Sequence, residues 1–451
     1  MSLLIRDATV ITVEPRGHIF EPGAVYVEGA RIVDVGPSDE VVRRHPTAAR
    51  VIDGRRKVVI PGFVSTHNHV GYTLFRGRAE DAGLGCVTGM YFPMTTVVTR
   101  PERLAVGSLT YAELLRSGVT TVLEMEEDAD VYAPFVERLG IRSLMGVMTL
   151  DVEVDGLRHD RYRYDAVLRS AQLRQAVEFA EAWHGKADGR ISVIMAPNMT
   201  ISSSPELLRE SRAAADRLGL RLSIHLGWGQ AEGVATRRLH GVSPYEYARR
   251  NGLLAPDVVA AHCYVIEDPD IALLAETRTA VAHCPLINSV RGYIAPVGEF
   301  RRRGITVGLG IDSMFSDYFE VVRACVLMAR LKEQNAVTMP TADALELATM
   351  GGARALGLER EIGSIETGKR ADLVVLDYRV FGLTPTLDPI QNLVYHAHAM
   401  NVETVLVDGR IVVDDHRLVH ADGSALIDSA QDAATAAWRR FVAKYGGIMA
   451  K

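Results

Sequence analysis

The sequence has little cysteine, and its four cysteines are far apart. They are Cys86, Cys263, Cys284 and Cys325. Small extracellular domains held by disulfides contain many more cysteines, and structural zinc sites use closely spaced pairs such as C-x-x-C. No such pair occurs here. We therefore expect buried free thiols, and neither a disulfide framework nor a cysteine-based metal site.

An excess of positive charge is also missing. Lysine and arginine total 50 against 56 aspartates and glutamates, which gives a formal net charge of -6. Proteins that bind nucleic acid or an anionic membrane need a basic surface, so we expect neither partner. Hydrophobic residues make up 48% of the chain and charged residues 24%, as in an ordinary globular protein. The expected partner is a small-molecule substrate.

Long apolar segments are absent too. No run of about eighteen apolar residues suggests a membrane span. Arg6 and Asp7 interrupt the stretch in which a signal peptide would need its apolar core. The sequence therefore predicts a cytoplasmic protein without a membrane anchor.

Both ends of the chain show the pattern of short strands, and the middle differs. Residues 1–60 and 361–423 contain short strands separated by turns. Residues 61–360 alternate apolar strands with helical patterns, as parallel βα repeats do. We expect the two ends to pair into one small β-sandwich domain around the inserted repeats, with a final helix in residues 424–451.

Eight strand candidates occur around and within the middle segment. They are residues 58–66, 120–125, 142–150, 191–197, 221–226, 258–263, 279–284 and 306–311. Helical patterns separate them, so the count fits an α/β fold of the (β/α)8 barrel type, with a doubly wound sheet as the alternative. In such a barrel, catalytic groups lie at the carboxyl ends of the strands.

The first candidate strand leads into the run Pro61-Gly-Phe-Val-Ser-Thr-His-Asn-His69. Residues at i and i+2 of a strand point to the same face, so the imidazoles of His67 and His69 can reach one ion. This spacing alone is a weak indication of metal binding. Its weight depends on the other strand ends.

Four further strands end in a histidine or an aspartate. The fifth ends at His225, the sixth at His262, the seventh at His283 and the eighth at Asp312. Because the strand ends of a barrel converge on one pocket, this pattern favours a metal site over scattered core histidines.

Neutral imidazoles and a carboxylate suit one divalent ion, with Zn²⁺ expected and Fe, Mn or Co as alternatives. The predicted ligands are His67, His69, His225 and Asp312. A metal lowers the pKa of its bound water, and Asp312 is then placed to accept the proton as general base. His262 and His283 are expected to face the substrate and to hydrogen-bond the developing oxyanion.

Together these motifs resemble the amidohydrolase superfamily, and within it the branch of s-triazine hydrolases, guanine deaminase and adenosylhomocysteine deaminase. The resemblance spans the opening β unit, the strand ends above, His283-Cys-Pro-Leu-Ile-Asn288-Ser, and the closing Gly363-Ser-Ile-Glu-Thr-Gly-Lys-Arg-Ala-Asp-Leu-Val-Val-Leu. It implies a (β/α)8 barrel with a flanking β-sandwich, and hydrolysis of a C–N bond or occasionally a C–Cl bond. It also implies a homodimer or higher homo-oligomer. Binuclear members bridge two ions through a lysine or a mid-barrel carboxylate; the fourth strand here has no lysine, which favours a single ion.

Two positions depart from the pattern of this branch. Its deaminases carry a glutamate three residues beyond the fifth-strand histidine, where it passes protons to the ring and to the leaving amine. Trp228 stands there instead, and an indole N–H can only donate. Relatives also have a substrate-facing histidine near the end of the fourth strand, where this chain has Asn198. Metal activation is expected to survive both changes, and the substrate chemistry to differ.

We therefore favour a metal-dependent amidohydrolase that hydrolyses a C–N bond of a urea, amide, carbamate or related small molecule. The phenylurea and molinate hydrolases of the wider branch are similar. The alternatives are an aminohydrolase (deaminase) or chlorohydrolase of a triazine, purine or pterin, and a catalytically silent ligand-binding barrel. The expected substrate contacts are Trp228, Asn198, Arg76, Glu126, Asn288 and Ser316.

Overall fold

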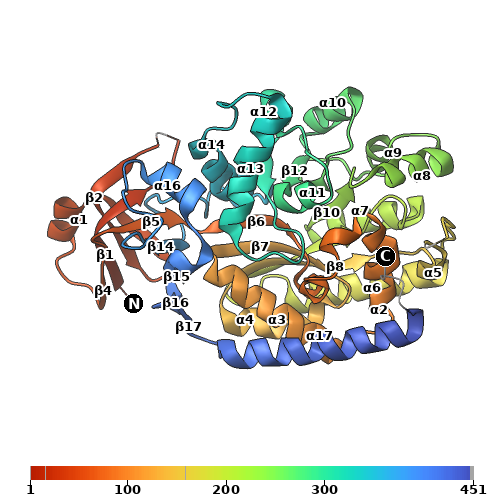
Figure 1. Cartoon of the computed structure of the whole chain (residues 1–451), viewed down its shortest axis with the longest axis horizontal. Coiled ribbons are helices and arrows are strands. Elements are labelled where there is room, and N and C mark those ends of the chain that lie inside the picture. The colour runs from red at the N-terminus through yellow and green to blue at the C-terminus, as the bar shows by residue number, and fades with distance from the viewer. Residues whose placement is uncertain (1, 16, 158, 447–451) are drawn as a thin grey trace.

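The computed structural model describes residues 2–15, 17–157 and 159–446. A barrel of eight parallel strands, covered by helices, stands beside a sheet that both ends of the chain build together (Figure 1). A long helix, α17 (Gly423–Tyr445), lies along the outside of the barrel. The predicted (β/α)8 fold and the pairing of the two chain ends are confirmed.

The barrel strands are hydrogen-bonded to one another in chain order. They are β6 (Phe63–Asn68), β7 (Val119–Glu126), β8 (Arg142–Thr149), β9 (Ile191–Pro197), β10 (Arg221–Leu226), β11 (Val258–His262), β12 (Ala280–His283) and β13 (Val307–Leu309). The backbone N–H of His69 donates to the carbonyl of Asp312 at 2.8 Å, and the N–H of Asp312 donates to the carbonyl of His67 at 3.1 Å. These two bonds link the first strand to the residues after the last, and they bring three predicted ligands side by side.

The first predicted strand is divided in the structure. The sequence pattern predicts one strand over residues 58–66, but β5 (Lys57–Pro61) belongs to the terminal sheet and β6 begins the barrel at Phe63. Gly62 lies between them, and a Cβ on this residue would stand 2.1 Å from Thr120 Oγ1. Only glycine allows so close an approach, so the chain passes from sheet to barrel within one residue.

The terminal sheet is a single mixed sheet of nine strands. Its order is β17-β16-β15-β14-β5-β1-β2-β3, and β4 pairs with β1. The remaining strands are β1 (Ser2–Ile11), β2 (Ile19–Glu28), β3 (Arg31–Pro37), β4 (Arg50–Asp53), β14 (Leu373–Asp377), β15 (Val402–Val407), β16 (Arg410–Asp414) and β17 (Arg417–Leu418). Because β14 pairs with β5, the last part of the chain completes the sheet that the first part begins.

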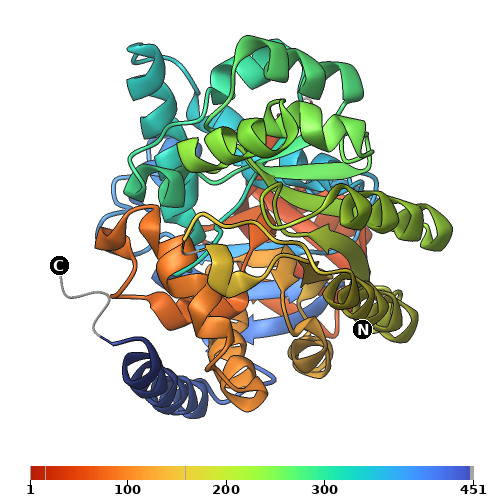
Figure 2. The ribbon, with the colours of Figure 1, turned by 90° about the vertical axis from the view of Figure 1, so that its right-hand side faces the viewer.

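Helices surround the barrel strands in the view of Figure 2. The longer ones are α3 (Arg100–Arg116), α4 (Ala129–Leu139), α6 (Ala166–Trp183), α7 (Pro205–Leu218), α8 (Gln230–His240), α10 (Asp268–Thr277), α13 (Tyr318–Glu333) and α16 (Pro389–His396). The shorter ones are α1 (Ser38–Arg44), α2 (Phe92–Thr95), α5 (Val154–Leu157), α9 (Pro244–Arg250), α11 (Pro285–Val290), α12 (Val297–Arg302), α14 (Thr341–Glu346) and α15 (Gly352–Ala355). Helix α7 shows how the sequence sets such bounds. The Ser204 side chain caps its first turn by accepting from the N–H of Leu207, and Gly219 ends it at φ 66°.

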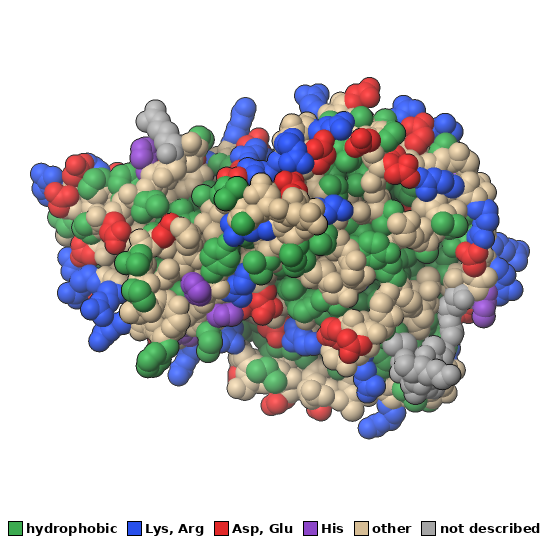
Figure 3. All heavy atoms as spheres, turned by 45° about the horizontal axis from the view of Figure 1, so that its top comes forward, with side chains coloured by type: hydrophobic (Ala, Val, Ile, Leu, Met, Phe, Trp, Pro, Cys, Tyr) green, Lys and Arg blue, Asp and Glu red, His purple; other side chains and the backbone are tan. Residues whose placement is uncertain are grey.

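Helix α17 packs against α3, and Trp438 Nε1 donates to the carbonyl of Leu74 at 2.8 Å. None of the helices in the described ranges combines the length and the apolar character that crossing a bilayer requires. On the face shown in Figure 3, acidic and basic side chains lie among one another. This face therefore carries mixed charge.

Candidate active site

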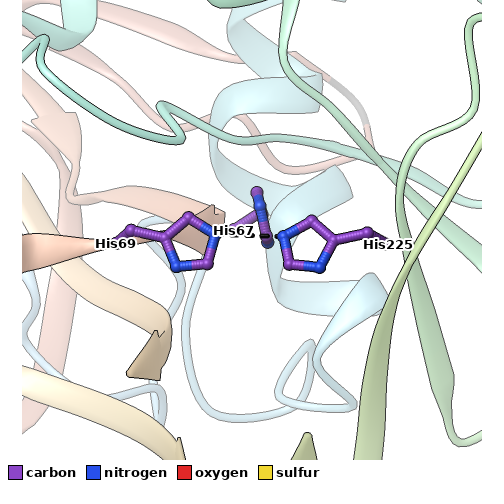
Figure 4. Close-up of side chains that lie close together, drawn as sticks. All are labelled: His67, His69 and His225. Carbon is purple, nitrogen blue, oxygen red and sulfur yellow. Dashed lines mark hydrogen bonds between the residues drawn. The ribbon is translucent and has the colours of Figure 1, made fainter. Parts of the chain in front are cut away.

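Three imidazoles meet at the carboxyl end of the barrel strands. His67 comes from β6, His69 follows it directly, and His225 comes from β10. The rings of His69 and His225 face each other across a nearly perpendicular His67 ring (Figure 4), and their Nε2 atoms are 3.0 Å apart. All three side chains are buried. The structure thus brings together the three histidines that the sequence predicts as ligands.

The outer nitrogens of two of these rings fix their tautomers. His69 Nδ1 lies 2.6 Å from the carbonyl oxygen of Met125, and His225 Nδ1 lies 2.6 Å from that of Asn198. Because a carbonyl oxygen only accepts, each Nδ1 carries the hydrogen and each Nε2 presents a lone pair. Two lone pairs at 3.0 Å repel each other unless both bind one cation. Neither nitrogen of His67 has a hydrogen-bond partner in the described ranges. The histidines therefore fit a divalent metal ion.

Burial keeps these imidazoles neutral, which is the form that binds metal. Desolvation lowers the pKa of His69 to about 4 and that of His225 to about 3. It also holds the pKa of His67 well below its usual value. All three rings are thus neutral at physiological pH.

Asp312 supplies a carboxylate just beyond β13. Its Oδ1 is 3.8 Å from His67 Nε2 and 3.9 Å from His69 Nε2. Its Oδ2 lies 4.0 Å from His262 Nε2 and has no hydrogen-bond partner among the residues described. One oxygen therefore faces the ligand histidines, while the other faces His262.

The backbone is left-handed at both His262 and Asp312, with φ of 75° and 70°. Residues other than glycine adopt this conformation rarely, and such positions cluster at functional sites. Asp312, the predicted general base, and His262, the predicted oxyanion contact, are thus both among the residues that the fold holds in this uncommon conformation.

Asn288 orients the His262 ring. Its Oδ1 lies 3.3 Å from His262 Nδ1, so it is a positioning residue and does not line the cavity. His283 ends β12, and burial lowers its pKa to about 4. Its nitrogens have no hydrogen-bond partner in the described part of the chain, and it does not line the cavity.

A cavity opens above the predicted ligands, with about 430 Å³ of empty space when the open solvent at its entrance is included. Trp228 and Asn198, two of the residues predicted to contact the substrate, line it. Apolar and aromatic walls come from Tyr72, Val87, Tyr91, Phe92, Met148 and Met199. Among the described residues that line it, Asp312 is the only carboxylate and Arg291 the only cation. The cavity is therefore largely apolar, with its polar groups gathered around the metal ligands.

Comparison with known proteins identifies the family. The amidohydrolase family profile matches residues 58–412. The chain belongs to the amidohydrolase family. This amidohydrolase is 33% identical to the 5'-deoxyadenosine deaminase of Methanosarcina mazei over 440 residues, covering 96% of this chain and 97% of the relative. It is 34% identical to the 5-methylthioadenosine/S-adenosylhomocysteine deaminase of Symbiobacterium thermophilum over 423 residues, 92% of this chain and 94% of the relative.

A solved structure agrees over the whole fold. The adenosine deaminase from Xanthomonas campestris with bound zinc superposes with a TM-score of 0.89 at 28% identity, covering 97% of this chain and 98% of the other. A second profile, the bacterial imidazolonepropionase-like composite domain, matches residues 23–48 in the terminal sheet. The predicted resemblance is confirmed, and the protein is a hydrolase acting on carbon–nitrogen bonds.

Like Asn288, three further predicted substrate contacts of this amidohydrolase lie outside the cavity. Arg76 is exposed, pairs with Glu113 at 2.7 Å, and donates to the carbonyl of Met314 at 2.8 Å. Glu126 is buried and accepts from the N–H of Gly71 at 2.7 Å. Ser316 is half-buried in the loop before α13. In this structure, none of the three lines the space above the metal ligands.

The carboxylates of Glu124 and Glu126 lie behind His69. Glu124 accepts from Asn68 Nδ2 and from the N–H of Val70, both at 2.8 Å. Burial raises the pKa of Glu124 to about 8 and that of Glu126 well above its usual range. Each of the two groups thus accepts from one backbone N–H of the loop after β6, while Glu126 Oε2 has no hydrogen-bond partner in the described ranges.

Arg291 is the site residue that the sequence did not reveal. It follows α11, and its Nη1 lies 3.5 Å from Asp312 Oδ2. An arginine in a loop after a strand is usually solvated, so the residue type alone does not predict a place in the site. The one available signal is that it follows the seventh strand, in the loops where barrels select their substrates.

Proposed function

We propose that this amidohydrolase binds one Zn²⁺ through His67, His69, His225 and Asp312, and hydrolyses the C–N bond of an acyclic urea, amide or carbamate. The zinc-bound deaminase of similar fold supports the choice of metal. The observation that carries the choice of substrate is the cavity lining, in which Asp312 is the only carboxylate of the described residues. A heterocycle deaminase needs a second proton carrier for the ring nitrogen, whereas an acyclic carbonyl does not.

A bound divalent ion supplies Lewis-acid activation of water and of the substrate carbonyl. Asp312 Oδ2, which has no hydrogen bond in the described ranges, is placed to accept a proton from the attacking water. The same oxygen then returns that proton to the departing nitrogen. One carboxylate thus serves both half-reactions.

His262 acts beside Asp312. Because Asn288 Oδ1 accepts from His262 Nδ1, the lone pair of Nε2 points toward Asp312 Oδ2 at 4.0 Å. In this tautomer His262 accepts a hydrogen bond from the water and orients it. With its Nε2 acting as an acceptor, His262 cannot donate a hydrogen bond to the oxyanion, which is the role expected for it from the sequence. The oxyanion then needs another donor.

Deamination of an adenosine-like heterocycle is the second candidate. The two relatives named above carry deaminase names, and the Trp228 indole lines the cavity with its Nε1 unpartnered within the described ranges. An indole can stack on a heterocycle and donate to a ring nitrogen. It cannot, however, carry the proton onward.

A screen of zinc-loaded protein against ureas, amides, carbamates, purine nucleosides and chlorinated triazines separates the candidates. We expect release of alkyl- or arylamine from the acyclic compounds and no ammonia from the heterocycles. Protein stripped of metal and then reloaded is the control, and activity should be lost and restored. Ammonia from a nucleoside, with no amine from any acyclic compound, would establish deamination instead.

Position 228 offers a sharper test. In Trp228→Glu a carboxylate replaces the indole, so we expect ammonia release from a heterocycle to appear and amine release to fall. Trp228→Phe is the matched control, because it keeps an aromatic wall without a carboxylate. An unchanged product range in both variants would show that this position does not select the chemistry.

We also propose a homo-oligomeric, cytoplasmic enzyme, and family resemblance supports this. Light scattering on the protein as it elutes from a size-exclusion column tests whether it is a homo-oligomer. The mass of a single chain in dilute solution would contradict that proposal.

A further inference from the structure

The Arg291 guanidinium is buried at the cavity without a hydrogen bond. Its side chain is 7% exposed, and it lines the cavity beside Asp312 and His262. Its one ion pair, Nη1 to Asp312 Oδ2 at 3.5 Å, is longer than a hydrogen bond. None of the guanidinium N–H groups donates to another residue in the described ranges. Five donors on a permanent charge are therefore available to a ligand.

Asp312 is an insufficient partner for this charge. The chemistry proposed above engages the aspartate with the metal ion and with the proton of the water. The imidazoles of His69, His225 and His262 cannot supply a negative charge, and no other carboxylate among the described residues lines the cavity. With a divalent ion bound, the site carries excess positive charge in an apolar setting. A buried charge without a counter-charge is costly, so the occupied site calls for an anion.

The shape of the cavity limits where that anion lies. Arg291 stands next to the oxygen that is placed to handle protons, so an anionic group on Arg291 lies a few bonds from the scissile C–N bond. Trp228, Phe92 and Met148 also line the cavity, and these apolar walls suit a hydrophobic substituent. A guanidinium forms two parallel hydrogen bonds with a carboxylate, which neither a neutral carbonyl nor a lone ammonium reproduces.

We propose that Arg291 binds a carboxylate of the substrate, which makes the substrate an N-acyl or N-carbamoyl amino acid with an apolar side chain. This inference rests on the proposed function and narrows its substrate class. Arg291 is then a specificity-determining residue, which fixes the position of the scissile bond relative to Asp312.

The test compares two probes of nearly equal shape, phenylacetate and phenylacetamide, by calorimetry on zinc-loaded protein. We expect wild type to bind phenylacetate at least about tenfold more tightly than the amide. Arg291→Met should remove this preference and leave the affinity for the amide within about twofold. Arg291→Lys should keep part of it, because a point charge remains without the planar fork.

Controls separate this role from a structural one. Arg237→Met removes an exposed arginine that pairs with Glu267, and it should change neither affinity. Zinc content and the unfolding midpoint are measured for every variant. If Arg291→Met fails to fold or to hold zinc, Arg291→Gln replaces it, and the carboxylate preference should be lost there as well.

The proposal is overturned if wild type shows no preference for the carboxylate, if it does not bind phenylacetate, or if the preference survives in Arg291→Met. In the last case the metal ion, and not Arg291, selects the carboxylate. Hydrolysis of neutral ureas without any carboxylate preference would leave the proposed function standing and reject this inference. A preference that depends on Arg291, together with ammonia release from heterocycles alone, would reject the proposed function instead.

Discussion

Two buried clusters of charged groups lie at opposite ends of the barrel strands, and they differ in how completely the chain satisfies them. Arg142 begins β8, where the barrel meets the terminal sheet, and its Nε donates to Asp372 Oδ2 at 3.2 Å. Its Nη2 donates to Asp408 Oδ1 at 2.6 Å. Asp408 also accepts from Arg370 at 2.9 Å, and its own N–H donates to Asp372 Oδ1 at 2.8 Å. We call Arg142, Arg370, Asp372 and Asp408 the lower cluster. Each of these charged groups has hydrogen-bond partners within the chain.

The second cluster lies at the mouth of the barrel, where the strands end at their carboxyl side, and it includes His67, Arg291 and Asp312. Its hydrogen bonding is incomplete by comparison. The ion pair between Arg291 and Asp312 is 3.5 Å long and without a hydrogen bond, and His67 has no hydrogen-bond partner in the described ranges. Buried polar groups in stable proteins are nearly always paired, so unpaired ones indicate that a ligand completes them. The lower cluster therefore serves stability and the mouth serves function, which is the division expected of this fold.

Asp312→Asn tests the mouth with the largest expected effect. The amide keeps the shape of the side chain but cannot take a proton from water, and it is a weaker metal ligand. We expect kcat to fall by about 10⁴-fold, while the protein remains cooperatively folded. The measurement is turnover of the best substrate from the screen, with a urea unfolding curve for each protein.

Asp343→Asn is the matched control for this variant, since Asp343 pairs with Arg301 at the surface. It should leave kcat unchanged. A rate near that of wild type in Asp312→Asn would remove Asp312 from the mechanism.

Arg142→Met should lower the stability of the fold and leave turnover unchanged, which is the opposite of the result expected for Asp312→Asn. It leaves the Asp372 and Asp408 carboxylates buried without their shared cation, which costs about 4 kcal/mol of unfolding free energy. Turnover per folded molecule should stay unchanged, because the mouth is untouched. Arg50→Met breaks the exposed pair with Asp414 in the same sheet and should cost less than about 1 kcal/mol. Urea unfolding measures both variants. Equal losses of unfolding free energy would show that the buried ion pairs of Arg142 stabilise the fold no more than an exposed pair does.

The four candidate metal ligands stand out in the sequence because their signal is local. His67, His69, His225 and Asp312 each follow an apolar strand, and the strands repeat regularly enough to predict a barrel whose ends converge. The same rule explains the one error in the strands, since residues 58–66 read as one apolar run and nothing local marks the change of sheet at Gly62.

The cavity walls are less predictable because loop paths decide them. Arg76 lies just beyond the first motif, yet the chain turns it outward to Glu113. Arg291 lies in a loop after α11, yet its guanidinium reaches Asp312 at 3.5 Å. Neither direction follows from a periodic pattern, so residue type and position in the sequence were insufficient for both arginines.

Glu232 shares features with both clusters, and replacing it gives the smallest effect that we expect. Its carboxylate accepts from Thr200 Oγ1 at 2.8 Å and from the N–H of Trp228 at 3.1 Å, so it is fully hydrogen-bonded like the lower cluster. No cation pairs with it among the described residues, however, and burial raises its pKa to about 7 from 4.5. It holds the backbone of Trp228 in place without lining the cavity.

The raised pKa of Glu232 makes stability depend on pH in one direction. Below pH 4.5 the group is protonated in both folded and unfolded chains, and its full contribution is present. Between pH 4.5 and about 7 the unfolded chain has lost the proton while the folded chain retains it, so stability declines as pH rises and levels off above about 7. Relative to Glu232→Gln, which does not titrate, wild type should lose up to about 3 kcal/mol over this window. Unfolding curves of both proteins at several pH values measure the difference, and a difference that does not change with pH would mean that Glu232 stays ionised when buried.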